Sequence, residues 1–170
     1  TWTVVVKGLC QQNKLNEAMD VVENMSARSD VKPNVVTFTT LIRGWCKRGD
    51  MEMATKVFDL ASKMNVVPDD ISYNTVIRGW CERGCEDRAI KVMKQMKEAG
   101  VRPNVVTFTT LIRSYCKNKN MSAAMSVLDV MRESGLRPDD RTYTTLMQGW
   151  IELKKMDRAM DLFKLMKRNK

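Results

Sequence analysis

Histidine is absent from the 170 residues of this chain. That absence removes the side chain that most often acts as a general base in enzymes and that most often binds metal ions. The eight glycines are scattered along the sequence and form neither of the familiar phosphate-cradling loops. We therefore expect no catalytic residue and no bound cofactor.

Paired cysteine motifs are also lacking. The five cysteines are an odd number, which argues against a complete disulfide framework and is typical of a reducing compartment. Cys81 and Cys85 are the only close pair, and no second pair completes four zinc ligands. The sequence thus predicts no metal site, with most of the thiols acting as small hydrophobic side chains.

Long apolar runs are missing too. No run approaches the roughly 18 residues that a membrane span needs, and the first residues show no signal-peptide pattern. The composition, 44% hydrophobic and 29% charged, is typical of a soluble globular protein, so we expect no membrane partner. The net charge of +9 favours an acidic partner, either a nucleic acid or an anionic surface.

The sequence is, however, rich in internal repetition. The segment NVVTFTTLIRGWCKRGDM from Asn34 aligns with NVVTFTTLIRSYCKNKNM from Asn104, and half of that displacement, 35 residues, also aligns. All four prolines, at positions 33, 68, 103 and 138, directly precede an Asn or Asp and mark the unit boundaries. We expect one repeat array over residues 1–170, with units at about 1–34, 35–69, 70–104, 105–139 and 140–170, as a fragment of a longer array.

Each unit is predicted to be a helical hairpin. The segment VVTFTTLI has a strand-like composition, but its apolar residues follow the i, i+3, i+4, i+7 spacing of a helix. A second helical series follows within the same unit. Neighbouring hairpins must stack to bury their apolar faces, so the expected fold is an all-α solenoid of five helix-turn-helix repeats, forming a superhelix with one concave surface. The two series in the second unit are Phe38, Leu41, Ile42 and Trp45, then Ala54, Val57, Phe58 and Ala61.

Small residues recur at two places in the units. Glycines between and after the paired helices should adopt the positive φ that a helix C-terminus favours. A second set lies within the first helices, where it would let adjacent first helices approach closely. The first set is Gly49, Gly84, Gly100 and Gly135, and the second is Gly8, Gly44, Gly79, Ser114 and Gly149.

A 35-residue unit of the form V-V-T-[FY]-[TN]-T-L-I-R-G-W-C, closed by G-[VL]-R-P-[ND], resembles the pentatricopeptide repeat (PPR) family in its pure 35-residue class. The resemblance covers essentially the whole chain, whereas the tryptophan and tyrosine pattern of the 34-residue tetratricopeptide repeat is not present. It implies sequence-specific binding of single-stranded RNA in plant organelles, the mitochondrion or the chloroplast, serving RNA stabilisation, processing, splicing or translation. The zinc-deaminase signature that some members append is missing here.

The resemblance also implies which residues choose the base, namely the fifth and the last residue of each unit. Applied in order, with the first unit at the 5′ end, they imply the sequence 5′-A-G-C(or U)-G-purine-3′. The fifth unit supplies Thr144, and its partner would lie beyond Lys170. The complete pairs are Thr3 with Asn34, Thr39 with Asp69, Asn74 with Asn104, and Thr109 with Asp139.

The closing residue of each pair has a chemical rationale. An ionised Asp only accepts hydrogen bonds, which suits the imino N–H of guanine or uracil, whereas Asn also donates, which suits the ring nitrogen of adenine or cytosine. The alternative is that Asn or Asp after proline forms an ordinary turn or helix N-cap. The polar identities vary at fixed places while the apolar residues around them barely change, which favours base selection.

Two further sets of residues complete the expected site. The second residue of each unit is implied by the resemblance to sandwich the base, although it would equally fill the interface between repeats. Cations one or two turns after the fifth residue would line the groove and contact phosphates, or would simply be solvated. The sandwiching residues are Val36, Ile71, Val106 and Arg141, of which the last departs from the aliphatic pattern, and the cations are Lys7, Arg43, Lys47, Arg78, Arg113 and Lys117.

Two other functions remain open. The array would also suit a protein-interaction scaffold, or a subunit of a larger ribonucleoprotein or transcription assembly. It would further suit the binding arm of an enzyme whose catalytic domain lies outside these residues.

Overall fold

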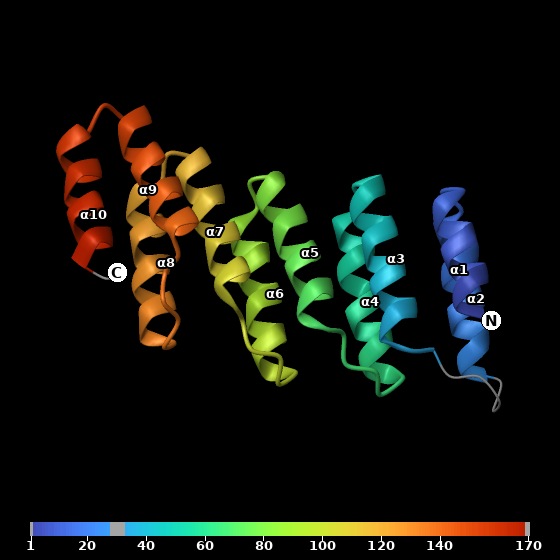
Figure 1. The fold of residues 1–170 in the computed structure, drawn as a ribbon. Coiled ribbons are helices and arrows are strands. Elements are labelled where there is room, and N and C mark those ends of the chain that lie inside the picture. The colour runs from blue at the N-terminus through green and yellow to red at the C-terminus, as the bar shows by residue number, and fades with distance from the viewer. Residues whose placement is uncertain (1, 28–32, 169–170) are drawn as a thin grey trace. The chain divides into compact units, whose positions relative to one another are not determined.

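The computed structural model describes residues 2–27 and 33–168, and within these ranges it contains ten α-helices and no strand (Figure 1). The segment with the strand-like composition is helical, so the prediction from its apolar spacing is confirmed. The boundary of the first unit at residues 28–32 lies outside the described residues. The helices are α1 (Trp2–Gln11), α2 (Leu15–Ala27), α3 (Val35–Arg48), α4 (Met51–Lys63), α5 (Asp70–Glu82), α6 (Glu86–Glu98), α7 (Val105–Lys117), α8 (Met121–Glu133), α9 (Asp140–Glu152) and α10 (Met156–Arg168).

Consecutive helices pair as hairpins, α1 with α2, α3 with α4, α7 with α8, and α9 with α10. Local residues set the turn of the second hairpin. In the second hairpin, Gly49 ends α3 with a φ of 89°, and its N–H donates to the carbonyl of Trp45. Asp50 then caps α4, because its side chain accepts a hydrogen bond from the N–H of Met53 at 3.0 Å. In Figure 1, α3 and α4 accordingly lie side by side.

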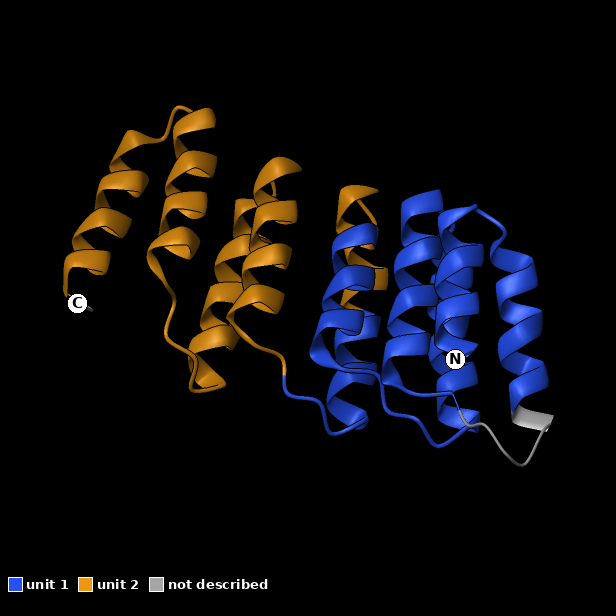
Figure 2. Ribbon diagram, turned by 45° about the vertical axis from the view of Figure 1, so that its right-hand side comes forward, with its two compact units in different colours: residues 1–79, 91–102 blue, residues 80–90, 103–170 orange. Residues whose placement is uncertain are grey.

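The contacts divide the chain into two compact units (Figure 2). The first unit comprises residues 1–79 and 91–102, in which α1 packs on α2 and α3, and α3 packs on α4. Its core includes Phe38, Leu41 and Ile42 at zero exposure, and Phe58 stacks on Tyr73 with ring centroids 4.5 Å apart. The buried side chains are those of the predicted helical series.

The second compact unit comprises residues 80–90 and 103–170. Here α7 packs on α8 and α9, and α9 packs on α10. Ile112, Leu128, Tyr143 and Leu146 are buried in one cluster. The guanidinium of Arg132 donates to the hydroxyl of Tyr143 at 3.1 Å, which gives the buried ring a polar partner at its edge.

Small residues on the first helices do permit close packing, with one exception. A Cβ added to Gly149 would lie 3.1 Å from the Cβ of Cys116, and one added to Gly44 would lie 2.7 Å from Leu15. At Ser114 the hydroxyl oxygen instead lies 3.1 Å from the carbonyl oxygen of Cys81. At Gly8, which lies in the first unit of the sequence, an added Cβ would meet no atom within 4 Å.

No described helix is both long enough and apolar enough to cross a membrane.

Candidate nucleic-acid interface

One cleft of the first compact unit gathers predicted residues of several kinds. Its lining comes from α1, from α3 and from the turn that precedes α5. It contains a fifth residue with its closing partner, a second-position aliphatic residue and three cations. These six are Thr39, Asp69, Val36, Lys7, Arg43 and Lys47, and the lining also includes Cys10, Gln11, Thr40 and Gly44.

The second-position aliphatic side chains lie outside the core. Val36 is 59% exposed, Ile71 is 53% exposed and Val106 is 60% exposed. Arg141, the residue at the same position of the last unit, is also exposed. A role in filling the interface between repeats does not fit side chains that are more than half open to solvent.

The closing Asn and Asp residues cap the helices that follow them. In each, Oδ1 accepts a hydrogen bond from the backbone N–H three residues later, which leaves the second terminal atom of the forked side chain out of that bond. The capping role weighed from the sequence is therefore confirmed. The bonds run from Thr37 to Asn34 at 3.0 Å, from Ser72 to Asp69 at 2.9 Å, from Thr107 to Asn104 at 3.2 Å, and from Thr142 to Asp139 at 2.7 Å.

The residue at the third position links the fifth residue to the closing residue. The Oγ1 of Thr39 lies 2.7 Å from the Oγ of Ser72, which donates to Oδ1 of Asp69 at 2.6 Å. Sequence reasoning missed this residue, although a hydroxyl recurs at that position in the second to fifth units: Thr37, Ser72, Thr107 and Thr142, all fully buried.

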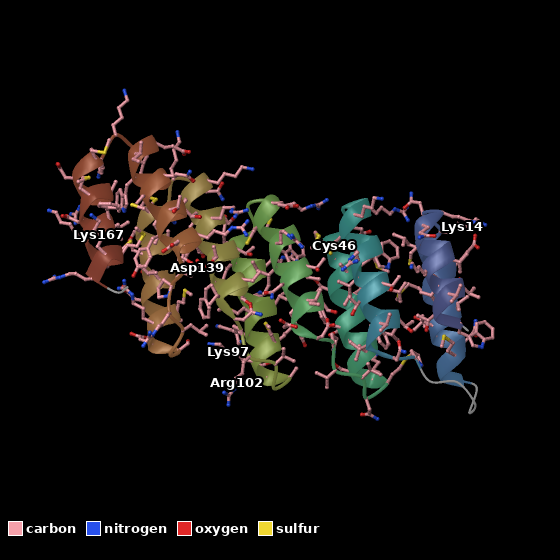
Figure 3. The ribbon with its side chains drawn as sticks, in the orientation of Figure 1. Lys14, Cys46, Lys97, Arg102, Asp139 and Lys167 are labelled. Carbon is pink, nitrogen blue, oxygen red and sulfur yellow. The ribbon has the colours of Figure 1, made fainter. Side chains whose placement is uncertain are left out.

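The same link occurs in two other units. The Oγ1 of Thr109 lies 2.9 Å from the Oγ1 of Thr142, which donates to Oδ1 of Asp139 at 2.7 Å. Asp139 precedes α9 and is labelled in Figure 3. For the pair of the first unit, the Oγ1 of Thr3 lies 3.3 Å from the Oγ1 of Thr37, which donates to Oδ1 of Asn34 at 3.0 Å.

Asn74, Asn104 and Thr144 complete the set of base-selecting candidates. Asn74 is a half-buried residue of the first compact unit. Asn104 belongs to the second, where its backbone N–H and side chain form a capping box with Thr107. Thr144 is exposed and donates to the carbonyl of Asp140 at 2.6 Å.

The candidate phosphate-binding cations are all exposed. Lys7, Arg43 and Lys47 line the cleft, and Arg78, Arg113 and Lys117 occupy the corresponding faces of α5 and α7. Within the described part of the chain, none of the six is paired with a carboxylate. Their charge is therefore available to an anionic ligand.

Burial keeps the thiols of Cys81 and Cys116 protonated and unreactive at neutral pH. Burial raises the pKa of the Cys81 thiol to about 11, with smaller effects from Ser114, Glu86 and Glu82, and burial raises that of Cys116 to about 11. Neither is a nucleophile at neutral pH. Among residues 2–27 and 33–168, no three metal-ligating side chains gather closely enough to hold an ion.

Solved structures share this fold. The crystal structure of the pentatricopeptide repeat protein PPR10 from maize superposes with a TM-score of 0.80 and 26% identity, over 99% of this chain and 24% of that one. PPR10 in complex with an 18-nt psaJ RNA element gives a TM-score of 0.74 at 26% identity, over 97% of this chain. The PPR domain of protein-only RNase P 1 from Arabidopsis thaliana, solved in complex with tRNA, matches at 0.71 with 16% identity, over 96% of this chain and 86% of that one, which shows the fold alone.

A curated relative is similar over a shorter stretch. A pentatricopeptide repeat-containing protein of Arabidopsis thaliana is 32% identical over 57 residues, which is 34% of this chain and 11% of that protein. The chain thus spans about a quarter of the maize protein and about a tenth of the Arabidopsis one.

Family models match along the whole sequence. The model described as the PPR repeat family matches residues 1–47, 33–82, 68–116 and 103–151, and the model described as the PPR repeat matches residues 141–170. Together with the hairpins and the solved structures, these matches show an all-α helical-repeat solenoid. The chain belongs to the pentatricopeptide repeat family.

Proposed function

We propose that this chain binds single-stranded RNA one base per unit, with the preference 5′-A-G-C(or U)-G-purine-3′. The observation that carries the proposal is the cleft in which Thr39, Asp69 and Val36 meet the cations Arg43 and Lys47. Side chains that distinguish bases, an apolar surface for the base face and charges for the phosphates lie there together.

Capping gives each closing residue a defined way to read a base. Because Oδ1 of Asp69 accepts from the N–H of Ser72, the second carboxylate oxygen is left to accept from a base. Because Oδ1 of Asn34 accepts from the N–H of Thr37, the amide Nδ2 is left, and it only donates. The cap therefore determines whether the closing residue offers the base an acceptor, as at Asp69, or a donor, as at Asn34.

The exposed second-position residues supply the stacking surface. Val36 and Ile71 present more than half of their side chains to solvent, so a base packing on them would cover apolar area that the fold leaves open. Arg141 offers a guanidinium at the same position, which also stacks on bases.

RNA complexes of relatives support the same function. The maize relative is solved with an 18-nt RNA element. Location in mitochondria or chloroplasts, and a part in RNA stabilisation, processing, splicing or translation, belong to the proposal and rest on the family. The chain itself would contribute binding and no chemistry.

Fluorescence anisotropy with the full chain tests this function. We expect RNA containing AGCGA to bind more tightly than RNA containing AACGA, and the affinity to fall steeply with added salt because phosphates are neutralised. A scrambled RNA of the same composition controls for non-specific attraction to the net charge. Equal affinity for the three RNAs would overturn base reading, and affinity that does not depend on salt would favour a protein scaffold.

A further inference from the structure

We propose that the buried third-position hydroxyl, represented by Ser72, is a positioning residue for base selection, because it joins the fifth residue to the closing residue of the same reading pair. The proposal rests on the proposed function. Ser72 is fully buried and therefore acts through Thr39 and Asp69 rather than on the base.

The hydroxyl hydrogens of Ser72 and Thr39 are both used in hydrogen bonds within the protein. Four oxygens form a chain: the carbonyl of Val35, Oγ1 of Thr39, Oγ of Ser72 and Oδ1 of Asp69, at successive separations of 2.8, 2.7 and 2.6 Å. Both ends of the chain only accept, and the two hydroxyls supply one hydrogen each. Two hydrogens thus serve three contacts, so both are engaged within the protein.

This arrangement fixes what Thr39 offers to a base. Its hydrogen is directed to Ser72 or to Val35, so its oxygen faces a ligand as an acceptor. Donating to a base would break an internal hydrogen bond, which is worth about 1 kcal/mol. Without the hydroxyl of Ser72, Thr39 would lose one of its two internal contacts, and Asp69 would retain only the backbone N–H at Oδ1.

The distance from the third-position hydroxyl to the closing residue depends on whether that residue is Asp or Asn. Where the closing residue is Asp69 or Asp139, the third-position hydroxyl lies 2.6 or 2.7 Å from Oδ1. Where it is Asn34 or Asn104, that distance is 3.0 or 3.2 Å. Shortening by an ionised acceptor is expected for charge-assisted hydrogen bonds.

The contact between the fifth-position and third-position hydroxyls is also shorter where the closing residue is Asp. The separation between the fifth-position and third-position hydroxyls is 2.7 Å for the Asp69 pair and 2.9 Å for the Asp139 pair, but 3.3 Å for the Asn34 pair. The two reading residues are therefore coupled through the hydroxyl between them, and they would not select a base independently.

The test compares Ser72→Ala with Ser72→Thr, since Thr occupies the same position in neighbouring units. For the full chain, dissociation constants are measured on RNAs with G or A at the second base, and with G or A at the fourth base. Ser72→Ala is expected to lower the preference for G at the second base about fivefold and to leave the fourth base unchanged. Ser72→Thr is expected to retain both preferences.

Ser114→Ala is the matched control, because it removes another buried hydroxyl, whose single hydrogen lies between two acceptors, the carbonyl of Cys81 and Oε1 of Glu86. It should lower stability without changing either base preference. If Ser72→Ala does not fold, Thr142→Val keeps the shape of the side chain and should lower the preference at the fourth base instead.

The outcomes separate the two proposals. A wild-type chain without base preference overturns the proposed function, and the positioning role with it. A selective wild-type chain whose Ser72→Ala variant is equally selective overturns the positioning role alone. Equal loss of affinity for all the RNAs would also overturn it, because that result is expected of a purely structural hydroxyl.

Discussion

Replacing Asp69 by Asn is the sharpest perturbation of the proposed reading, because it changes the polarity of one atom and keeps the fold around it. Asn34 and Asn104 already cap α3 and α7 through the same Oδ1 bond, at 3.0 and 3.2 Å. The cap of α5 should therefore survive in Asp69→Asn. The loss of one negative charge at the start of this helix costs about 0.3–1 kcal/mol of stability.

The expected effect on base preference is much larger. In the variant, the atom left to face the base is an amide nitrogen instead of a carboxylate oxygen, so guanine is mismatched and adenine becomes matched. Each mismatched polar contact costs about 1 kcal/mol or more. The two together amount to about 2 kcal/mol, which changes the ratio of the two dissociation constants about 30-fold.

Anisotropy titrations on AGCGA and AACGA measure that ratio for the wild type and the variant. Asp70→Asn is the control, because it removes the same charge from the start of the same helix without touching the cap. We expect the preference to reverse in Asp69→Asn and to persist in Asp70→Asn. A ratio that both substitutions change equally would refute the reasoning, since only the charge would then matter.

Other predictions address the remaining parts of the site and the fold. Ile71→Ala should weaken RNA binding about fivefold without lowering the melting temperature, whereas Ile77→Ala, in the core of the same helix, should cost about 2–5 kcal/mol of stability. The logarithm of the RNA affinity should fall with the logarithm of salt with a slope of about −4, if the six cations named above each neutralise one phosphate. Urea unfolding should show Gly8→Ala to be stabilising by about 0.5–1 kcal/mol and Gly149→Ala to be destabilising, because an added Cβ meets nothing within 4 Å at the first and a neighbouring helix at the second. Cys81, whose pKa burial raises to about 11, should resist alkylation at pH 8 in the folded chain and react after unfolding, as followed by mass spectrometry.

The hairpins were predictable because each of their signals is local. Apolar spacing identified α3 against a strand-like composition, since periodicity reports which face is buried and composition does not. Gly49 and Gly84 do adopt the positive φ expected of them. Lys119 and Lys154 adopt it at the equivalent turns, with φ values of 59° and 58°, and no sequence signal marked them. The fold imposes a positive φ at these two lysines, although that backbone conformation is unfavourable for residues with a Cβ.

Contacts between repeats were harder to predict from the sequence. Ser114 stands where the other units have glycine, and its hydroxyl donates to Glu86 at 2.6 Å, while Asn118 donates to the same carboxylate oxygen. The link from Thr39 through Ser72 to Asp69 likewise joins residues of two successive repeats. Such bonds depend on how one hairpin packs on the next, which spacing within a single unit does not report.

Capping and base reading were alternatives at the level of sequence, but the geometry makes them compatible in one side chain. Asp69 uses one oxygen for the helix and keeps the other, and Asn34 uses its oxygen and keeps its nitrogen. Ser or Thr would also cap a helix, but a hydroxyl both donates and accepts at a single atom and would not distinguish an imino N–H from a ring nitrogen. Only a short forked side chain both caps the helix and presents one fixed polarity, so the proposed base reading accounts for the presence of Asn and Asp alone at the closing position of this array.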